Sequence, residues 1–161
     1  SVLNRLRMDA WFYQTLHRDI TDIPEEILER IRIETTKEPL LNHNTIKNIL
    51  RNLKLQKYYD CIYLIFAHIQ NDSVTIVSPE LEKIVYNMLN DVRQCQIKQC
   101  LGILPYGYVL YKLFQHLKKD DYLQLVPLLK SEEKLSSYDR RWKAICEELQ
   151  WEYIPSATKP I

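Results

Sequence analysis

The chain has 161 residues, 46% of them hydrophobic, and its 22 basic and 21 acidic side chains leave a formal net charge of +1. These values suit one globular domain and exclude a chain that attracts nucleic acid through its net charge alone. Two glycines stand against eleven tyrosines, three tryptophans and three phenylalanines, which argues against phosphate-cradling glycine loops and tight hairpins and favours a mostly helical fold.

The cysteines occur singly rather than in closely spaced pairs. They are Cys61, Cys95, Cys100 and Cys146. We therefore expect reduced thiols and no metal or other cofactor in this chain. A zinc site that joins Cys95 and Cys100 to His68 or His116 is an alternative, which we disfavour because a second closely spaced ligand pair is missing. No apolar run is long enough to cross a bilayer and no signal peptide opens the chain, so a soluble intracellular protein is expected.

Two helices are predicted before residue 40. Val2–Leu16 mixes apolar and basic residues and predicts a helix on the outside of the fold. Residues 1–20 are predicted to be a helical extension or linker, and residues 21–161 the main helical domain. The second helix is predicted to start within Thr21–Glu26, which supplies capping side chains, a proline and two acids, and to end at Thr35–Pro39. Its predicted buried stripe is Ile27, Leu28 and Ile31.

The third predicted helix, capped by Asn42 or Asn44, carries the clearest basic feature of the sequence. Its predicted buried arc is Ile46, Ile49, Leu50 and Leu53. Its predicted basic residues are Lys47, Arg51, Lys54 and Lys57. The first three recur at i, i+4 and i+7 on a second arc, and no acid occurs between Leu40 and Tyr59. One interpretation is a solvated helix face; the other is a contact with nucleic acid or an acidic partner, in which each neutralised phosphate strengthens binding in a salt-dependent way.

The middle of the chain predicts two further helices. Tyr58–Ile69 is so continuously apolar that we expect a central buried helix. Asn71–Ser73 predicts a turn and Val74–Val77 a short extended link. Ser78 then caps a helix that has proline at its first position. Its predicted apolar stripe is Leu81, Ile84, Val85, Met88, Leu89 and Val92.

The last third is rich in aromatic residues at helical spacing, which favours core packing over a base-stacking platform. It predicts a helix over Tyr106–Leu117, a short turn from Asp120 or Asp121 through Leu125, and a stop at Pro127. One more turn over Ser131–Leu135 and a last helix over Ser137–Leu149 are expected to follow. The last helix would carry Arg140, Arg141 and Lys143 near the positive end of its dipole. Cations at the positive end of a helix dipole destabilise the helix, so local stability does not explain this arrangement. A contact with a phosphate or an acidic surface would explain it, and a tertiary salt bridge would explain it equally well.

Catalytic motifs are weak. Glu25–Glu26, Glu132–Glu133 and Glu147–Glu148 are adjacent pairs whose side chains diverge on a helix, so they are poor candidates for paired acid and base catalysis. The histidines lie singly, and no nucleophile or nucleotide-binding motif occurs. We expect a protein that is not an enzyme.

Several short motifs resemble those of one protein family. They are Ile23–Glu26, Leu53–Leu55 with Lys57–Tyr59, Pro79–Lys83, Tyr108–Lys112, Pro127–Ser131 with Lys134–Leu135, Asp139, Trp142–Lys143, Ile145–Leu149, Trp151–Glu152 and Ile154–Ser156. In this order they resemble the poxvirus late transcription factor 3 family of large nucleocytoplasmic DNA viruses. The resemblance covers nearly the whole chain and is most specific after Tyr106. One departure is Lys98–Leu104, where relatives usually carry a proline and a basic, aromatic run.

The resemblance implies an all-α domain of about six to eight helices in an irregular bundle, reminiscent of cyclin-like initiation-factor domains. It implies a non-enzymatic factor for late viral genes whose partners are the viral RNA polymerase, other late transcription factors and promoter DNA, with no membrane contact. It implies action in a viral factory of the host cytoplasm or in the host nucleus, with packaging in the virion compatible, and allows for a zinc ribbon upstream of Ser1. We hypothesise that the seven basic residues named above make the contacts. The alternative is an interaction adaptor or packaged structural protein that does not bind DNA.

Overall fold

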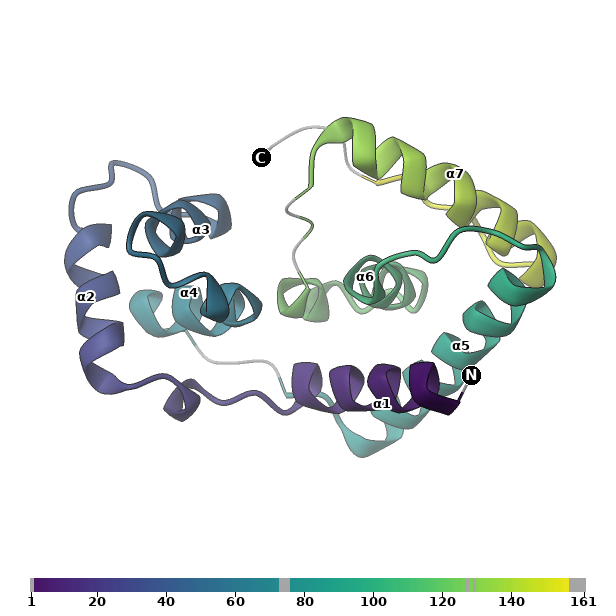
Figure 1. Cartoon of the computed structure of the whole chain (residues 1–161), viewed down its shortest axis with the longest axis horizontal. Helices are drawn as coiled ribbons and strands as arrows, with labels where there is room; N and C mark the ends of the chain where they lie inside the picture. The colour runs from purple at the N-terminus through teal and green to yellow at the C-terminus, as the bar shows by residue number, and fades with distance from the viewer. Residues whose placement is uncertain (1, 73–75, 127, 129, 157–161) are drawn as a thin grey trace. The chain divides into compact units, whose positions relative to one another are not determined.

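The computed structural model describes residues 2–72, 76–126, 128 and 130–156. Its regular elements are seven α-helices and three short 3-10 helices, and the described ranges contain no strand (Figure 1). The predicted all-α class is therefore confirmed. The chain divides into two compact units, unit 1 (residues 1–76) and unit 2 (residues 77–161), and each is considered by itself. The predicted boundary between residues 20 and 21 stays a prediction.

Unit 1 contains four α-helices and two 3-10 helices. They are α1 (Val2–Leu16), η1 (Ile20–Asp22), α2 (Glu25–Thr35), α3 (His43–Asn52), η2 (Gln56–Cys61) and α4 (Ile62–Gln70). Helix α3 packs against both α2 and α4. Most of the predicted stripes supply its core, because Leu28, Ile31, Ile46 and Leu50 are each no more than 6% exposed. Ile27 and Leu53 were also predicted to be buried, but both are only half-buried. Burying side chains of this size stabilises the unit by roughly 1.5–3 kcal/mol each.

Local capping explains where the helices of unit 1 begin. Of the two predicted caps of α3, Asn42 is the one used: its side-chain oxygen accepts a hydrogen bond from the Thr45 N–H at 2.9 Å. Helix α2 differs from expectation, since Pro24 stands at its N-cap position without a side-chain hydrogen bond. The carboxylate of Asp22 instead closes a capping box with Asp19 around η1.

The predicted helix over Tyr58–Ile69 is in fact two elements, η2 followed by α4. The N–H of Leu55 bonds the Leu50 carbonyl at 2.7 Å as α3 ends, so the chain is redirected within a few residues and resumes as a tight 3-10 turn. Burial is as predicted, because Ile62, Tyr63, Leu64 and Ile65 are all buried. The end of the predicted turn and the start of the link, residues 73–75, lie outside the described residues.

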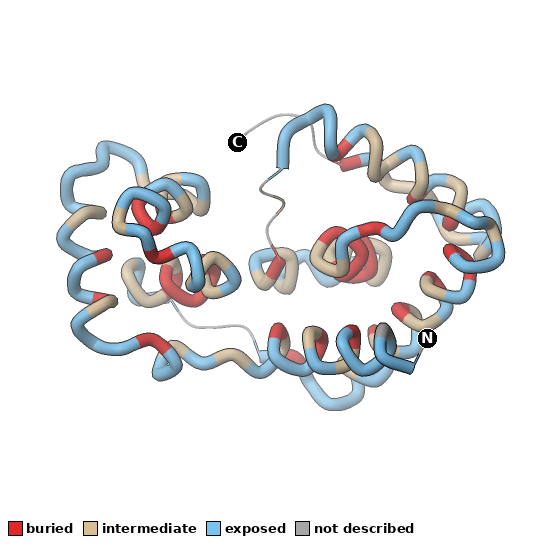
Figure 2. Tube along the Cα trace, in the orientation of Figure 1, coloured by how far each residue is buried: buried red, intermediate tan, exposed pale blue. Residues whose placement is uncertain are grey.

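Unit 2 is built from three α-helices and one 3-10 helix. They are α5 (Pro79–Lys98), α6 (Tyr106–His116), η3 (Asp120–Leu125) and α7 (Glu132–Leu149). Helix α5 packs against both α6 and α7, and buried residues crowd α6 (Figure 2). Ser78 caps α5 as predicted, accepting the Leu81 N–H at 3.2 Å. Ile84 was wrongly placed in the buried stripe of α5; it is 49% exposed and lies at the edge of that stripe.

Helix α7 is longer than predicted. The expected turn at Ser131–Leu135 and the expected helix from Ser137 form one continuous helix, Glu132–Leu149. Ser131 caps it by accepting the Lys134 N–H at 3.4 Å, and Glu132 and Glu133 occupy its positive first turn. No glycine or proline interrupts the helix after this cap, so it continues. Pro127, the predicted stop before it, lies outside the described residues.

Candidate functional site

Lys47 and Arg51 lie one turn apart on α3, at the i, i+4 spacing that places two side chains on one helix face. Lys47 is half-buried and Arg51 is exposed, while Ile46, Ile49 and Leu50 are buried on the opposite arc. The buried arc therefore fixes the orientation of the basic one, and unit 1 presents two cations on the outer face of α3.

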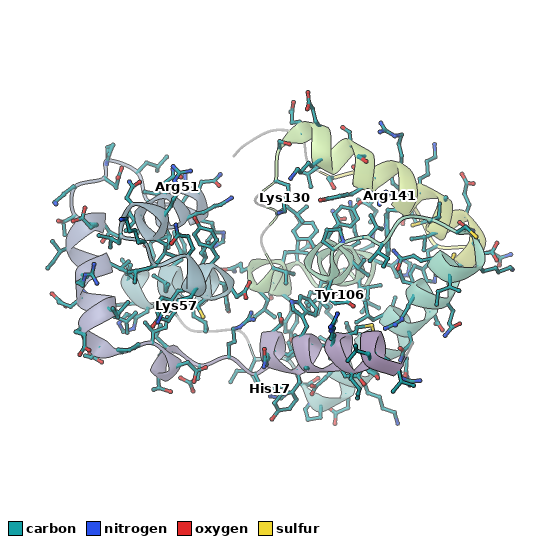
Figure 3. All side chains as sticks on the ribbon, in the orientation of Figure 1. His17, Arg51, Lys57, Tyr106, Lys130 and Arg141 are labelled. Atoms are coloured by element: carbon teal, nitrogen blue, oxygen red, sulfur yellow. The ribbon has the colours of Figure 1, made fainter. Side chains whose placement is uncertain are left out.

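Lys54 and Lys57 do not lie on this helix, contrary to the prediction. Helix α3 ends at Asn52, and Lys54 has a left-handed backbone with a φ of 60°. Lys57 belongs to η2, and Figure 3 shows the labelled Arg51 and Lys57 well apart within unit 1. The predicted cluster of four is therefore a pair on α3 with two exposed lysines that follow it.

Tyrosine rings accompany two of these cations. The Lys47 ammonium lies 5.9 Å from the centre of the Tyr59 ring, and the Lys57 ammonium lies 5.2 Å from that of Tyr58. Contacts of this kind hold a lysine in place without neutralising its charge. Within the described part of the chain, no carboxylate lies within salt-bridge distance of Arg51, Lys54 or Lys57. This surface can therefore accept phosphate or carboxylate groups.

The second predicted group, on α7, has a different setting from the one expected. Because α7 begins at Glu132, Arg140, Arg141 and Lys143 lie in its middle turns rather than near the positive end of its dipole. The helix begins with two acids, which that dipole favours. The dipole argument for a phosphate contact at these residues was therefore wrong.

The three side chains of this group also point in different directions. The Arg141 guanidinium is half-buried, 5.5 Å from the centre of the Tyr138 ring, and donates a hydrogen bond to the Ser137 hydroxyl at 3.5 Å. The Lys143 ammonium lies 5.9 Å from the centre of the Tyr153 ring, and Arg140 is exposed. Successive helical residues turn by about 100°, so these cations do not form one patch.

A buried polar network in unit 2 was not predicted as such. The Asp139 carboxylate accepts hydrogen bonds from the Tyr108 hydroxyl, from the Ser156 N–H at 2.9 Å and from the Ser156 hydroxyl at 2.7 Å. The Lys112 side chain is 1% exposed; its ammonium donates to the Ile154 carbonyl at 2.7 Å and lies 3.8 Å from Asp139. The network ties α6, α7 and the segment after α7 together.

Opposing effects set the protonation of this network. Burial by itself would raise the pKa of Asp139, but hydrogen bonds from Tyr108 and Ser156, together with the Lys112 charge, bring it below its ordinary value. Burial lowers the pKa of Lys112, an effect that the nearby Asp139 opposes. Burial, followed by the Asp139 contact, raises the pKa of Tyr108 well above its ordinary value. These shifts favour an ionised Asp139 that accepts a hydrogen bond from the protonated Tyr108 hydroxyl.

One signal in the sequence points to this network. Asp139 lies four residues after Leu135 and three before Trp142, both of which are buried, so an acid adjoins the apolar stripe of α7. A buried carboxylate needs partners. The partners lie 31 and 27 residues earlier, at Tyr108 and Lys112, and their identity follows only from the fold.

The structure also bears on the zinc alternative. Cys95 is buried and Cys100 is exposed. Within the described residues, no three side chains of histidine, cysteine, aspartate or glutamate gather closely enough to hold a metal ion. The helices in those ranges include none that combines the length and apolar character needed to span a membrane.

Comparisons with known proteins give relatives among large DNA viruses. Residues 2–153 match the family model described as poxvirus late transcription factor VLTF3 like. A494R of Paramecium bursaria Chlorella virus 1, provisionally named a transcription factor, is 34% identical over 145 residues, which cover 83% of this chain and 40% of that protein. R429 of Acanthamoeba polyphaga mimivirus, named in the same way, is 28% identical over 147 residues, which cover 86% of this chain and 34% of that protein. The chain thus spans less than half the length of these two relatives. No solved structure matches it significantly.

Proposed function

Because the chain belongs to the family of poxvirus late transcription factor VLTF3-like proteins, we propose that it acts in the transcription of late viral genes. In this proposal it is a non-enzymatic factor that works with a viral RNA polymerase and other late transcription factors at late promoters. It needs no cofactor bound to this chain, contacts no membrane, and acts where the virus transcribes, in a cytoplasmic viral factory or in the nucleus.

Within this role, unit 1 contacts promoter DNA through the outer face of α3. The supporting observation is the pair Lys47 and Arg51, which share one helix face and are oriented by the buried arc opposite them. Phosphate contacts of this kind add affinity without reading sequence. Lys54 and Lys57 extend the surface beyond the end of α3. The α7 residues Arg140, Arg141 and Lys143 are weaker candidates because their directions differ.

A second candidate is an adaptor that docks on the polymerase or another viral factor without touching DNA. The observation that favours it is the separation of the predicted basic cluster. Because Lys54 and Lys57 lie outside α3, the helix itself carries only two cations, which can contact only a short length of DNA backbone. An acidic protein surface would suit such a pair equally well.

Charge reversal separates the two candidates. The double variant Lys47→Glu, Arg51→Glu is expected to lower affinity for a late-promoter duplex by tenfold or more at low salt, since both phosphate contacts are replaced by repulsion. Each lost contact should reduce the slope of log affinity against log salt by about 0.9. Fluorescence anisotropy over a series of salt concentrations measures both quantities.

The matched control is Arg30→Glu with Lys83→Glu, which changes the net charge equally through exposed residues of α2 and α5. This control should keep most of the DNA affinity and the full salt slope. If the α3 variant binds DNA with unchanged affinity and slope while both variants still capture the polymerase, the adaptor is the correct function.

A further inference from the structure

Unit 2 contains a small cavity at the start of α6, with a volume of about 110 Å³. Its lining includes Gly107, Tyr108, Leu128, Lys130, Leu135 and Tyr138. Figure 3 labels three residues of this region from three segments of the chain: Tyr106 from the start of α6, Lys130 from the segment before α7, and Arg141 from α7. Lys130 is exposed, so the cavity reaches the surface of the unit.

The size of the cavity limits what it can hold. Sites for cofactors and drug-sized ligands measure about 300–1,000 Å³, several times more than this cavity. An apolar cavity of about 150 Å³ holds a benzene molecule. The cavity of unit 2 is therefore matched to one aliphatic or small aromatic side chain. A β-carbon added at Gly107 would meet no heavy atom of the described residues within 4 Å, beyond its own helix backbone and chain neighbours, so none of these residues fills the space beside it.

The chemistry of the lining favours an apolar occupant. Leucine side chains and tyrosine rings form most of the wall, and the Tyr108 hydroxyl already donates to Asp139. A nucleotide base would bury ring nitrogens and exocyclic groups against these carbons, and leaving such groups unpaired is costly. A leucine, isoleucine or methionine side chain has no such groups. The lining therefore favours a protein segment over a nucleic acid.

Three cations lie near the lining of the cavity, and one of them, Lys130, belongs to it. Lys134 and Arg141 lie four residues before and three residues after Tyr138, so all three share one face of the helix, and Lys130 joins them from the cavity wall. Glu132 lies three residues before Leu135, on the side of α7 away from Lys134 and Arg141, so the cations near the lining outnumber this acid. Asp139 is committed to Ser156, Tyr108 and Lys112. An acidic partner complements this setting.

We propose that this cavity is a docking site for an acidic segment of a partner protein, which inserts one bulky apolar side chain beside Gly107 and places its carboxylates near Lys130, Lys134 and Arg141. A single anchoring side chain in a pocket, rimmed by charge, is a common way for a short segment to bind. The site lies wholly in unit 2 and does not depend on the proposed DNA contact of unit 1.

The test uses the full chain and two short peptides of glutamate and serine, one with a central leucine and one with a central alanine. The leucine peptide should bind at least about tenfold more tightly, because it alone fills the cavity. It should shift the backbone NMR signals of Gly107, Leu135 and Tyr138. The variant Gly107→Leu fills the cavity from within and should reduce binding of the leucine peptide to that of the alanine peptide. Gly107 has no positive φ, so leucine fits this helical position and should preserve the circular dichroism spectrum.

Charge variants give an independent measurement on a surface residue. Lys130→Glu should weaken the leucine peptide severalfold at low salt, and the control Lys83→Glu on α5 should not. Equal binding of the two peptides, full binding by Gly107→Leu, or no binding at all would overturn the proposal. The proposal would also be overturned if a single-stranded oligonucleotide, and not the leucine peptide, shifted the same NMR signals, since the cavity would then bind nucleic acid.

Discussion

Replacing Asp139 by alanine should cost unit 2 about 3–5 kcal/mol of unfolding free energy, as expected when one member of a buried ion pair is removed. The loss is large because three polar groups lose their interaction partner at the same time. The Lys112 ammonium, 1% exposed, loses its counter-charge, and the Tyr108 hydroxyl and Ser156 lose their acceptor. Urea denaturation of the full chain, followed by far-UV circular dichroism, measures the change.

Two controls separate the network from charge in general. Glu148→Ala removes an ion pair with Lys98, whose side chain is 74% exposed, and should change stability far less, because solvent screens such pairs. Lys112→Met combined with Asp139→Leu removes both charges and should cost clearly less than Asp139→Ala alone. If Asp139→Ala is no more harmful than Glu148→Ala, the network does not stabilise the unit.

The same network should leave a mark on the pH dependence of stability. Folding lowers the pKa of Asp139. Its contribution to the free energy of unfolding is therefore fully present above the ordinary carboxyl pKa, near 3.9, and is lost as the pH falls through the lower pKa of the folded state. Asp139→Asn removes this titration, and its stability should fall less steeply than that of the parent protein below about pH 4.

Replacing Trp142 by alanine should cost about 3–5 kcal/mol, the range for large aromatic side chains deleted from a core. Trp142 is 2% exposed, and its ring centre lies 6.3 Å from that of Tyr108 and 6.1 Å from that of Trp151. Removing it leaves a void that α6 and the segment after α7 can close only in part. Urea denaturation followed by circular dichroism measures the loss without relying on tryptophan fluorescence.

Trp151→Ala is the matched comparison. Trp151 is only half-buried, and its ring is tilted against that of His116 with the ring centres 4.9 Å apart. Its removal loses less buried apolar surface and should cost clearly less. Equal losses for the two tryptophans would show that Trp142 is not a central core residue.

The helices themselves were well predicted from periodicity and caps. Ser78 with Pro79 fixed the start of α5, and the Ile46, Ile49 and Leu50 arc fixed the buried side of α3. The errors lie where local preference is weak. A break was expected between Leu135 and Ser137. Helix α7 continues through Ser136 and Ser137, although serine is a poor helix residue, because Leu135 and Trp142 bury the same face.

The candidate site was only partly predictable. Helical spacing correctly placed Lys47 and Arg51 on one face of α3. Because α3 ends at Asn52, Lys54 and Lys57 lie beyond it. The position of a helix end cannot be predicted from sequence to within one turn. The family resemblance was right, since residues 2–153 match that family. Several of the motif residues that carried it, Tyr108, Lys112, Asp139 and Ser156, join in one buried network. These motif residues hold unit 2 together, and the proposed contacts lie on surfaces outside that network.

A photo-crosslinking residue at Asn44 tests the proposed DNA contact most directly. Asn44 is exposed and lies seven residues before Arg51, on the same face of α3, so the substitution leaves Lys47 and Arg51 intact. In complexes of the full chain with polymerase and a late promoter, the probe should crosslink to promoter DNA, whereas the same probe at Arg30 on α2 should not. Crosslinks from Asn44 to protein alone, with none to DNA, would contradict the proposed role of α3.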